Sequence, residues 1–330
     1  MNHLTVIGCG AWATTIAKVL AENGHAVTQW CHRSEYAQAI NEKHENTKAL
    51  PGVVLPASLN ATEDLGEALS KAEGLVIGLA SAHLHTVEHI KPYFQAEVPV
   101  LNLCKGLVTG QNPPFALSYL NRVLETTNSC TLSGPNLALE IASQKPAASV
   151  VAGDSAAAHR FQHWLSNRYF RIYVSDDPRG VEVGGIFKNA LAIAAGLADG
   201  LQLGSNAKAA LLTRGMIEMV RLGTHLGGQP ATFYGLSGIG DLIATCSSDK
   251  SRNWQVGHGI ASGTFPLPAN RDAQNGPIAE GVKTAAVLSR IGHEAGLDLP
   301  ILYGLESVLF KQQNPLEVIQ SWMGRDLRHE

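Results

Sequence analysis

Residues 3–24, HLTVIGCGAWATTIAKVLAENG, decide the fold class of this chain. The apolar run at 3–7 predicts a strand. Residues 11–23 carry apolar side chains at helical spacing and end at Gly24, a typical residue after the last turn of a helix. Residues 8–13, GCGAWA, lie between strand and helix and match the pattern G-x-G-x-x-A.

This pattern predicts a dinucleotide-binding turn. Gly8 permits the tight turn, Gly10 lets the backbone approach a pyrophosphate, and Ala13 is small enough for close packing of helix on strand. The N-terminus of the helix would face the phosphates. An ordinary glycine-rich turn is the alternative, but the position between a strand and a helix favours the nucleotide site.

The rest of the chain predicts two domains. Further strands are expected at residues 26–30, 74–79, 98–104, 130–133, 147–152 and 170–174. Their alternation with helical patterns predicts a parallel sheet with helices on both faces. After about residue 180 the helical patterns continue without convincing strands. We therefore expect an α/β NAD(P)-binding domain at 1–179 and an all-α substrate domain at 180–330.

Composition excludes several function classes. The 330 residues include 25 Lys and Arg against 28 Asp and Glu, a net charge of −3, which gives no electrostatic case for binding nucleic acid or an anionic membrane. The five cysteines are widely spaced without C-x-x-C, which favours a reducing compartment. We find no apolar run close to the 18 residues of a membrane span and no signal peptide, and expect a soluble, cytoplasmic protein.

The end of the second strand bears on the choice of cofactor. An acidic residue there would bind the ribose 2′-hydroxyl of NAD, but residues 29–33 read QWCHR. His32 and Arg33 could instead meet a 2′-phosphate. We therefore predict that NADP is accepted and preferred over NAD; the alternative is that Arg33 is only a solvated residue at a helix start.

Two lysines are candidate catalytic groups. Lys105 follows the 98–104 strand, at the edge where ligands bind in such sheets, although it could be a solvated strand-end residue. Lys188 lies in GGIFKNALAI, a segment apolar nearly all round, so it should be buried. Burial favours the neutral form that a general base needs, unless the side chain reaches out to solvent. Asn189 beside it could orient an alcohol or carbonyl.

Polar groups elsewhere add to these candidates. Asp241 and Thr245 are four residues apart and share a helix face, where Asp241 could bind a substrate hydroxyl, pair with Lys188 or cap the helix. Ser251, Arg252 and Asn253 could together grip a phosphate, or form only a polar turn. Residues 85–89, HTVEH, match a zinc-protease pattern, but no clear third ligand accompanies them and no metal site is predicted.

Four segments in order carry a family resemblance: 181–196 (VEVGGIFKNALAIAAG), 206–223, 235–253 and 279–284 (AEGVKT). With the glycine-rich turn, they resemble NAD(P)-dependent glycerol-3-phosphate dehydrogenases of the bacterial type over essentially the whole chain. The resemblance implies a Rossmann-like N-terminal domain, an all-α C-terminal domain of 6-phosphogluconate dehydrogenase-like architecture, and a homodimer. It implies reversible reduction of dihydroxyacetone phosphate to sn-glycerol 3-phosphate, which supplies glycerophospholipid synthesis.

The resemblance also implies roles for single residues. Lys188 would donate the proton in ketone reduction and accept it in alcohol oxidation. The expected catalytic group is Lys188, Lys105, Asp241, Asn189 and Thr245. Substrate contacts are expected for Lys105, Gly134, Asn136, Lys188, Asp241, Ser251, Arg252 and Asn253. Cofactor contacts are expected for Gly8, Gly10, Ala11, Trp12, His32, Arg33, Lys105, Ala138, Arg252, Ile278 and Glu280.

A few positions depart from the family pattern. Ala13 stands where glycine is usual, Asn136 replaces the commoner Ser or Thr, and the proline often seen after the 74–79 strand is absent. None of these changes removes a charged group. Two alternatives stay open: a dehydrogenase of similar architecture that acts on a carboxylate such as a β-hydroxy acid, and a non-catalytic NADP-binding sensor.

Overall fold

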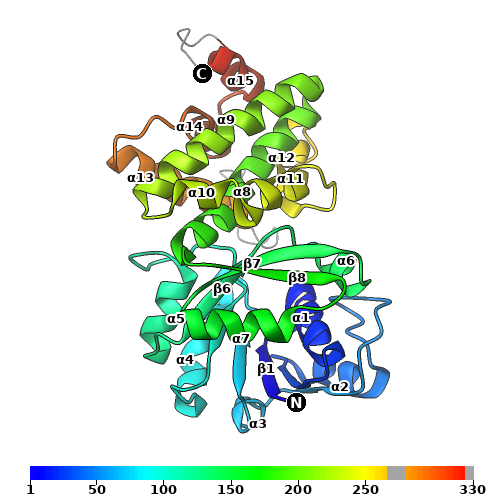
Figure 1. The fold of residues 1–330 in the computed structure, drawn as a ribbon. Coiled ribbons are helices and arrows are strands. Elements are labelled where there is room, and N and C mark those ends of the chain that lie inside the picture. The colour runs from blue at the N-terminus through cyan, green and yellow to red at the C-terminus, as the bar shows by residue number, and fades with distance from the viewer. Residues whose placement is uncertain (266–278, 324–330) are drawn as a thin grey trace. The chain divides into compact units, whose positions relative to one another are not determined.

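The structure of the protein, a computed structural model, describes residues 1–265 and 279–323. The chain divides into two compact units, Met1–Glu182 and Val183–Glu330. The first unit holds an eight-stranded sheet, and the second is helical over its described residues (Figure 1). This confirms the predicted fold class, an α/β N-terminal part followed by an all-α C-terminal part.

The sheet of the first unit has the strand order β3-β2-β1-β4-β5-β6-β7-β8. The strands are β1 (His3–Ile7), β2 (Ala26–Trp30), β3 (Leu59–Thr62), β4 (Gly74–Ile77), β5 (Val100–Asn102), β6 (Ser129–Ser133), β7 (Ala147–Gly153) and β8 (Phe170–Ser175). Neighbouring strands from β3 to β6 are parallel, so their carboxyl ends lie at one edge. The loops that follow them are therefore placed together, where ligands bind in such sheets.

Two details of the sheet differ from expectation. The expected parallel sheet is interrupted because β7 runs antiparallel to β6, while β8 is parallel to β7. The only helix between β6 and β7 is the short α6 (Ala138–Ala142), so this connection is no full crossover and β7 returns alongside β6. Strand β3 was not predicted, because its four residues, LNAT, form no apolar run.

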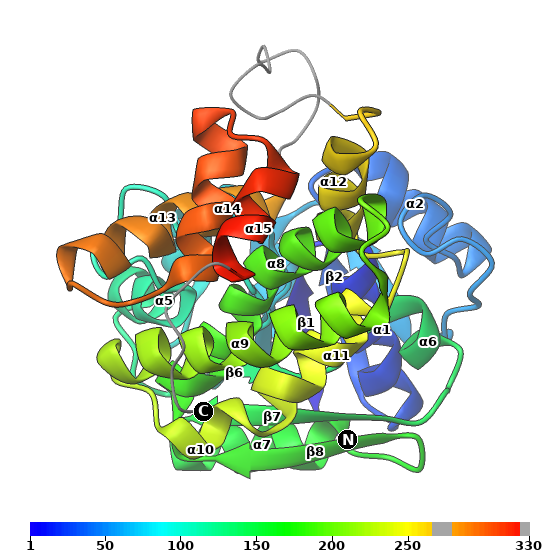
Figure 2. The same cartoon turned by 90° about the horizontal axis from the view of Figure 1, so that it is seen from above.

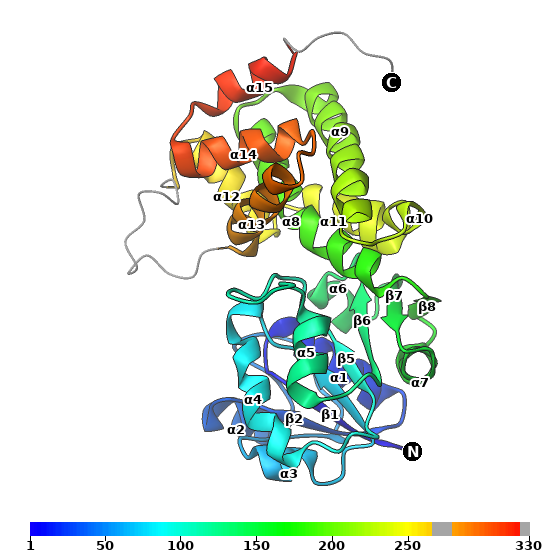
Figure 3. The ribbon, with the colours of Figure 1, turned by 90° about the vertical axis from the view of Figure 1, so that its left-hand side faces the viewer.

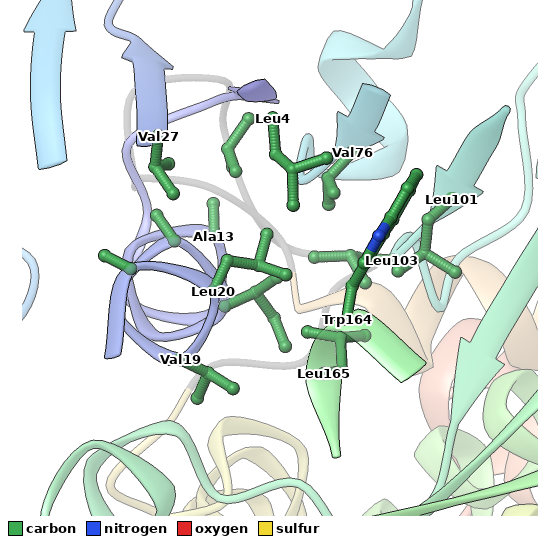
Figure 4. Packing of buried hydrophobic residues seen from close by; sticks show 14 of the residues in the cluster. Leu4, Ala13, Val19, Leu20, Val27, Val76, Leu101, Leu103, Trp164 and Leu165 are labelled. Atoms are coloured by element: carbon green, nitrogen blue, oxygen red, sulfur yellow. The ribbon is translucent and has the colours of Figure 1, made fainter. Parts of the chain in front are cut away.

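Helices cover both faces of the sheet (Figure 3). They are α1 (Ala11–Glu22), α2 (Ser34–Lys43), α3 (Leu65–Leu69), η1 (Ser81–Thr86), α4 (Val87–Ile90), η2 (Lys91–Tyr93), α5 (Ala116–Leu124), α6, and α7 (Ser155–Leu165). Side chains of α1 and α7, such as Leu20 and Trp164, pack with Leu4 and Val76 of the strands (Figure 4). The neighbouring β4 residue Ile77 instead joins the opposite core with α3, α4 and α5, as strand alternation requires.

The second unit is organised around α8 (Pro178–Gly200), which begins at the end of the first unit (Figure 2). The other helices are α9 (Gly204–His225), α10 (Pro230–Phe233), the π-helical turn η3 (Leu236–Gly240), α11 (Asp241–Cys246), α12 (Arg252–Ala261), α13 (Glu280–Glu294), α14 (Pro300–Lys311) and α15 (Pro315–Met323). By length and composition α8 is apolar enough to cross a membrane, contrary to the sequence prediction that no such run exists. Its apolar window is entirely buried inside the protein, as also occurs in core helices of soluble proteins.

Small residues let other helices approach α8 closely. A Cβ atom on Gly196 would lie 2.1 Å from the carbonyl oxygen of Trp254 in α12, and one on Gly257 would lie 2.0 Å from that of Ile193. A Cβ on Gly184 would lie 2.6 Å from the carbonyl oxygen of Ser237 in η3. These backbone-to-backbone contacts fix α12 and the turn before α11 against the helix that carries Lys188.

Candidate active site

The first group of candidate residues is the turn between β1 and α1 in the first unit. Gly8 has φ +114°, and a Cβ there would lie 2.6 Å from the carbonyl oxygen of Gly78, so only glycine fits. Gly10 caps α1 without a side-chain hydrogen bond, and a Cβ on Gly10 would meet no described atom within 4 Å. Ala11 and Trp12 open the helix. The helix N-terminus thus has an open, electropositive approach of the kind that binds a pyrophosphate.

Buried polar side chains that the sequence reasoning missed hold this turn in shape. The Gln29 amide donates to the carbonyl oxygen of Gly8 at 2.8 Å, and the Asn46 amide donates to that of Cys9 at 2.9 Å. Both amides also donate to the Thr14 hydroxyl, at 3.0 and 2.9 Å. All three residues are buried, and no periodic pattern marks them, since a buried hydrogen-bonded Gln or Asn is visible only once its partners are known.

The residues proposed for the adenosine end lie at the start of α2. His32 Nδ1 is 3.5 Å from Cys9 Sγ, and the His32 ring contacts that of Tyr36. Arg33 is the residue before α2; its half-exposed side chain pairs with Glu35 at 3.5 Å. An exposed ion pair of this kind contributes at most about 1 kcal/mol, so Arg33 can exchange Glu35 for a phosphate.

Trp12, also predicted to contact cofactor, has a buried indole Nε1 with no hydrogen-bond partner among the described residues. Its ring packs edge-on against Phe170, with ring centroids 6.5 Å apart. A buried donor without an acceptor is uncommon and costs free energy. An acceptor on a bound cofactor would satisfy it.

Lys105 and the turn after β6 form a second group in the first unit. The Lys105 ammonium donates to the carbonyl oxygen of Gly134 at 2.8 Å. Gly134 has φ +138°, and its Cβ position lies 3.0 Å from the Ser149 Cα, so glycine is required there. The Ser149 hydroxyl donates to Asn136 Oδ1, which leaves the buried Asn136 Nδ2 without a partner in the described part of the chain.

Ala138, the other residue expected near cofactor in this turn, is the first residue of α6. Its carbonyl oxygen accepts a hydrogen bond from Thr15 Oγ1 of α1 at 3.2 Å. Helices α1 and α6, which both begin near the carboxyl edge of the sheet, are therefore joined directly.

The second unit brings three of the predicted catalytic residues together. Lys188, on α8, is 8% exposed, and its ammonium donates to Asp241 Oδ1 and, at 2.9 Å, to Thr245 Oγ1. Asp241 and Thr245 lie one turn apart on α11 and are buried. Asp241 therefore pairs with Lys188, one of the roles its sequence position suggested. The carboxylate compensates the buried charge, which would otherwise be strongly unfavourable.

Asn189, next to Lys188, is tied to two other helices. The Asn253 amide of α12 donates to Asn189 Oδ1 at 2.9 Å, and Asn253 Oδ1 accepts from the Gly281 backbone N–H of α13 at 3.0 Å. A Cβ on Gly281 would lie 2.5 Å from the Asn189 carbonyl oxygen. The starts of α12 and α13 are thus held beside the lysine.

The remaining predicted residues lie at these two helix starts. Ser251 is the N-cap of α12, and its hydroxyl accepts from the Trp254 backbone N–H at 3.3 Å. Arg252 is the first residue of that helix and is exposed, and Glu280 is the first residue of α13. Ile278 lies outside the described residues. In the described part of the chain, no group of three or more His, Cys, Asp or Glu side chains is placed to hold a metal ion. Residues 85–89, which match the zinc-protease pattern, therefore belong to no such group.

Two buried carboxylates were also missed. Glu182 Oε1 accepts from the Leu117 backbone N–H at 2.9 Å, and burial raises its pKa to about 7. Glu218 accepts from the backbone N–H groups of Ile301 and Leu302 at 2.7 and 3.0 Å, and burial raises its pKa to about 7 as well. Glu218 thereby caps the N-terminus of α14, a structural role.

Family models match nearly all of the chain. Residues 3–159 match the N-terminal model of NAD-dependent glycerol-3-phosphate dehydrogenase, and residues 177–320 match its C-terminal model. The chain belongs to the NAD-dependent glycerol-3-phosphate dehydrogenase family. It is therefore an NAD(P)-dependent oxidoreductase, as predicted from the resemblance.

Individual members of the family are similar over their full length. The chain is 39% identical to glycerol-3-phosphate dehydrogenase (NAD(P)+) of Lysinibacillus sphaericus, over 100% of this chain and 98% of that protein. The enzyme of the same name from Geobacillus thermodenitrificans is also 39% identical, over 100% and 97%. The crystal structure of glycerol-3-phosphate dehydrogenase from Coxiella burnetii superimposes with a TM-score of 0.88 at 30% identity, covering 98% of this chain and 99% of that one.

Proposed function

We propose that this family member reduces dihydroxyacetone phosphate to sn-glycerol 3-phosphate with NAD(P)H, reversibly, and so supplies glycerophospholipid synthesis. Residues 1–179 would bind the cofactor and residues 180–330 the substrate. The observation that carries the proposal is the buried cluster of Lys188, Asp241 and Thr245. Reduction of a ketone needs a proton donor near the carbonyl oxygen, and a lysine held in place in this way can serve as one.

The turn at residues 8–13 fits a nicotinamide dinucleotide. Gly10 and the N-terminus of α1 would hold the pyrophosphate, with Trp12 and Ala138 beside it. Bound NAD(P)H supplies the hydride that reaches C2 of the ketone. The protein's own part is then to hold substrate and cofactor in register and to deliver the proton.

Lys188 is the proposed proton donor. An ammonium has three N–H donors, and among the described residues Asp241 and Thr245 receive two of them. The third is left for the ketone oxygen, which becomes negatively charged as C2 accepts hydride. Proton transfer from Nζ then gives the alcohol, and Asp241 and Thr245 keep Nζ in place throughout. Asn189, held by Asn253, would orient the same oxygen or its neighbour.

The phosphate of the substrate would be bound by a cationic group and by a helix start. Arg252 and the Ser251-capped N-terminus of α12 supply a guanidinium and backbone donors, and Asn253 lies beside them. Lys105, Gly134 and Asn136 are proposed as further substrate contacts. Binding energy from the phosphate thus orients the ketone, which carries no charge of its own.

We also propose that NADP is preferred over NAD, that the protein is a cytoplasmic homodimer, and that no metal takes part. The exposed guanidinium of Arg33, whose ion-pair partner among the described residues is the exposed Glu35, supports recognition of a 2′-phosphate. His32 and Glu280 would contact the cofactor as well.

The test is an assay of purified protein with dihydroxyacetone phosphate and NADPH or NADH, followed by absorbance of the reduced nicotinamide. We expect rapid oxidation, faster with NADPH, and little with unphosphorylated dihydroxyacetone. Equal rates with and without the phosphate, or turnover only with β-hydroxy or α-keto acids, would contradict the substrate assignment. Cofactor binding without turnover of either class would leave a non-catalytic NADP-binding protein.

A further inference from the structure

Two cysteines meet at the dinucleotide turn. Ile7 of β1 pairs with Trp30 of β2, and the Gly8 backbone N–H donates to the Trp30 carbonyl oxygen at 3.0 Å. Cys9 and Cys31 therefore leave neighbouring parallel strands at the same edge. Both are free thiols at this edge of the sheet, and His32, the residue after Cys31, lies with its Nδ1 3.5 Å from Cys9 Sγ.

The two thiols differ in reactivity. The hydrogen bond from Cys31, together with His32 Nδ1 at 3.5 Å, lowers the pKa of Cys9 to about 6 despite burial. The contact with Cys9, together with burial, raises the pKa of Cys31 far above its ordinary value. Cys9 is 8% exposed whereas Cys31 has no exposed surface, so a small oxidant reaches Cys9 first. The thiolate is the reactive form, which again selects Cys9.

We propose that Cys9 and Cys31 form a reversible disulfide when the protein meets a hydroperoxide, and that this disulfide weakens NAD(P)H binding. The effect on binding rests on the proposed role of residues 8–13 in holding the cofactor. The chemistry of the thiol pair does not depend on that role.

The oxidation proceeds in two balanced steps. The Cys9 thiolate attacks one peroxide oxygen, the O–O bond breaks, and Cys9 becomes a sulfenic acid while the peroxide leaves as an alcohol or water. The sulfur of Cys31 then attacks the Cys9 sulfur, an S–S bond forms and the S–O bond breaks. The departing hydroxide takes the Cys31 proton as water. Two thiols and one hydroperoxide thus give one disulfide, one alcohol or water, and one water, with two electrons transferred.

The disulfide would disturb the turn because close packing and hydrogen bonds already restrict the backbone there. The two sulfur atoms must approach to about 2.05 Å, closer than hydrogen-bonded thiols, so the backbone at Cys9 or Cys31 has to move. Gly8 already lies against the Gly78 carbonyl oxygen, and the Cys9 carbonyl oxygen is held by Asn46. A displacement near 1 Å in an element that positions a ligand can lower the reaction rate about a hundredfold. We therefore expect the Kd for NADPH to rise at least about tenfold.

The experiment compares reduced and peroxide-treated protein. Trypsin cuts after Lys18 and Arg33, so peptides 1–18 and 19–33 carry Cys9 and Cys31 separately. Without reductant, mass spectrometry should find the two peptides joined, and NADPH titration should show the weaker Kd, restored by dithiothreitol. The Cys31→Ser variant should bind NADPH normally when reduced and should give no joined peptides after peroxide treatment. After brief peroxide treatment followed by dithiothreitol, it should keep its affinity for NADPH. Cys31→Ala is the second variant if serine is not tolerated in this buried position.

Cys130→Ser is the matched control. Cys130 is a buried thiol of the same unit, and burial raises its pKa well above the ordinary value. This variant should cross-link peptides 1–18 and 19–33 as the unmodified protein does. Absence of the joined peptide after peroxide treatment, or a disulfide that leaves the Kd for NADPH unchanged, would overturn the proposal. If the reduced protein itself fails to bind NADPH, the proposed cofactor role fails instead, and the cross-link still reports on the thiol pair.

Discussion

Replacing Asp241 by Asn should destabilise the protein because it removes the charge partner of a buried lysine. The Lys188 and Asp241 side chains are 10% and 2% exposed, so water cannot take over the carboxylate's role. Breaking a buried ion pair by removing one partner costs about 3–5 kcal/mol. Since Thr245 still accepts from Lys188 and Asn keeps the shape of Asp, we expect the lower end, about 3 kcal/mol off the free energy of unfolding.

The assay is urea unfolding followed by circular dichroism, with three further variants. Lys188→Met alone should also destabilise, because it leaves the Asp241 charge buried. The double variant Lys188→Met/Asp241→Asn should be more stable than the sum of the two single effects predicts, because no unpaired charge remains. Lys311→Met is the control, since the Lys311–Glu306 pair is exposed at the lysine and should contribute less than about 1 kcal/mol. Additive single effects, or an Asp241→Asn variant within about 0.5 kcal/mol of the parent, would refute this reasoning.

Four other perturbations have defined outcomes. Arg33→Asp should reverse the preference for NADPH over NADH, measured as the ratio of kcat/KM values. Gly10→Ala should fold normally, because its Cβ meets no described atom within 4 Å, but should weaken NADPH binding at least about tenfold by filling the pyrophosphate approach. Gly257→Ala should lower the free energy of unfolding by about 1–3 kcal/mol, because its Cβ would lie 2.0 Å from the Ile193 carbonyl oxygen. Glu182 has a folded-state pKa raised to about 7, so between its ordinary pKa of 4.5 and 7 it binds more protons in the folded state than in the unfolded state. Its contribution to stability should therefore fall by up to about 3 kcal/mol as the pH rises through that window. Glu182→Gln should flatten the dependence of the free energy of unfolding on pH in this range.

Each of these has a contrary result. An unchanged NADPH/NADH ratio in Arg33→Asp would show that Arg33 is only a solvated residue at the start of α2. Normal NADPH affinity in Gly10→Ala would place the pyrophosphate elsewhere. A fully stable Gly257→Ala would mean that α12 can move away from α8 at little cost. For Glu182, a pH dependence equal in the Gln variant and the parent would assign the slope to other groups.

The sequence was sufficient where a local pattern carries the information. The strand-turn-helix at residues 3–24 predicts β1, the turn and α1 because glycine spacing and apolar periodicity are both local. Lys188 could be singled out because a lysine in a nearly all-apolar helix must be paired or functional, and its partner Asp241 was one of the candidates. Both residues are buried and bonded to each other.

The features that sequence did not predict depend on contacts between distant segments. The antiparallel β7 follows from how residues 134–146 return to the sheet, which no periodicity encodes. Gln29 and Asn46 support the turn from positions 17 residues apart in sequence, and a buried amide has no pattern until its partners are known. The close approach of α12 to α8 depends on Gly196 and Gly257 facing carbonyl groups of another helix.

The most direct test of Lys188 as the proton donor is turnover by Lys188→Ala, measured in parallel with NADPH binding by the same variant. Rapid mixing with dihydroxyacetone phosphate should show loss of nearly all hydride transfer, while the Kd for NADPH stays within a small factor of the parent value. Asn189→Ala, beside it on α8, should lose less. Near-normal turnover by Lys188→Ala would show that another group supplies the proton.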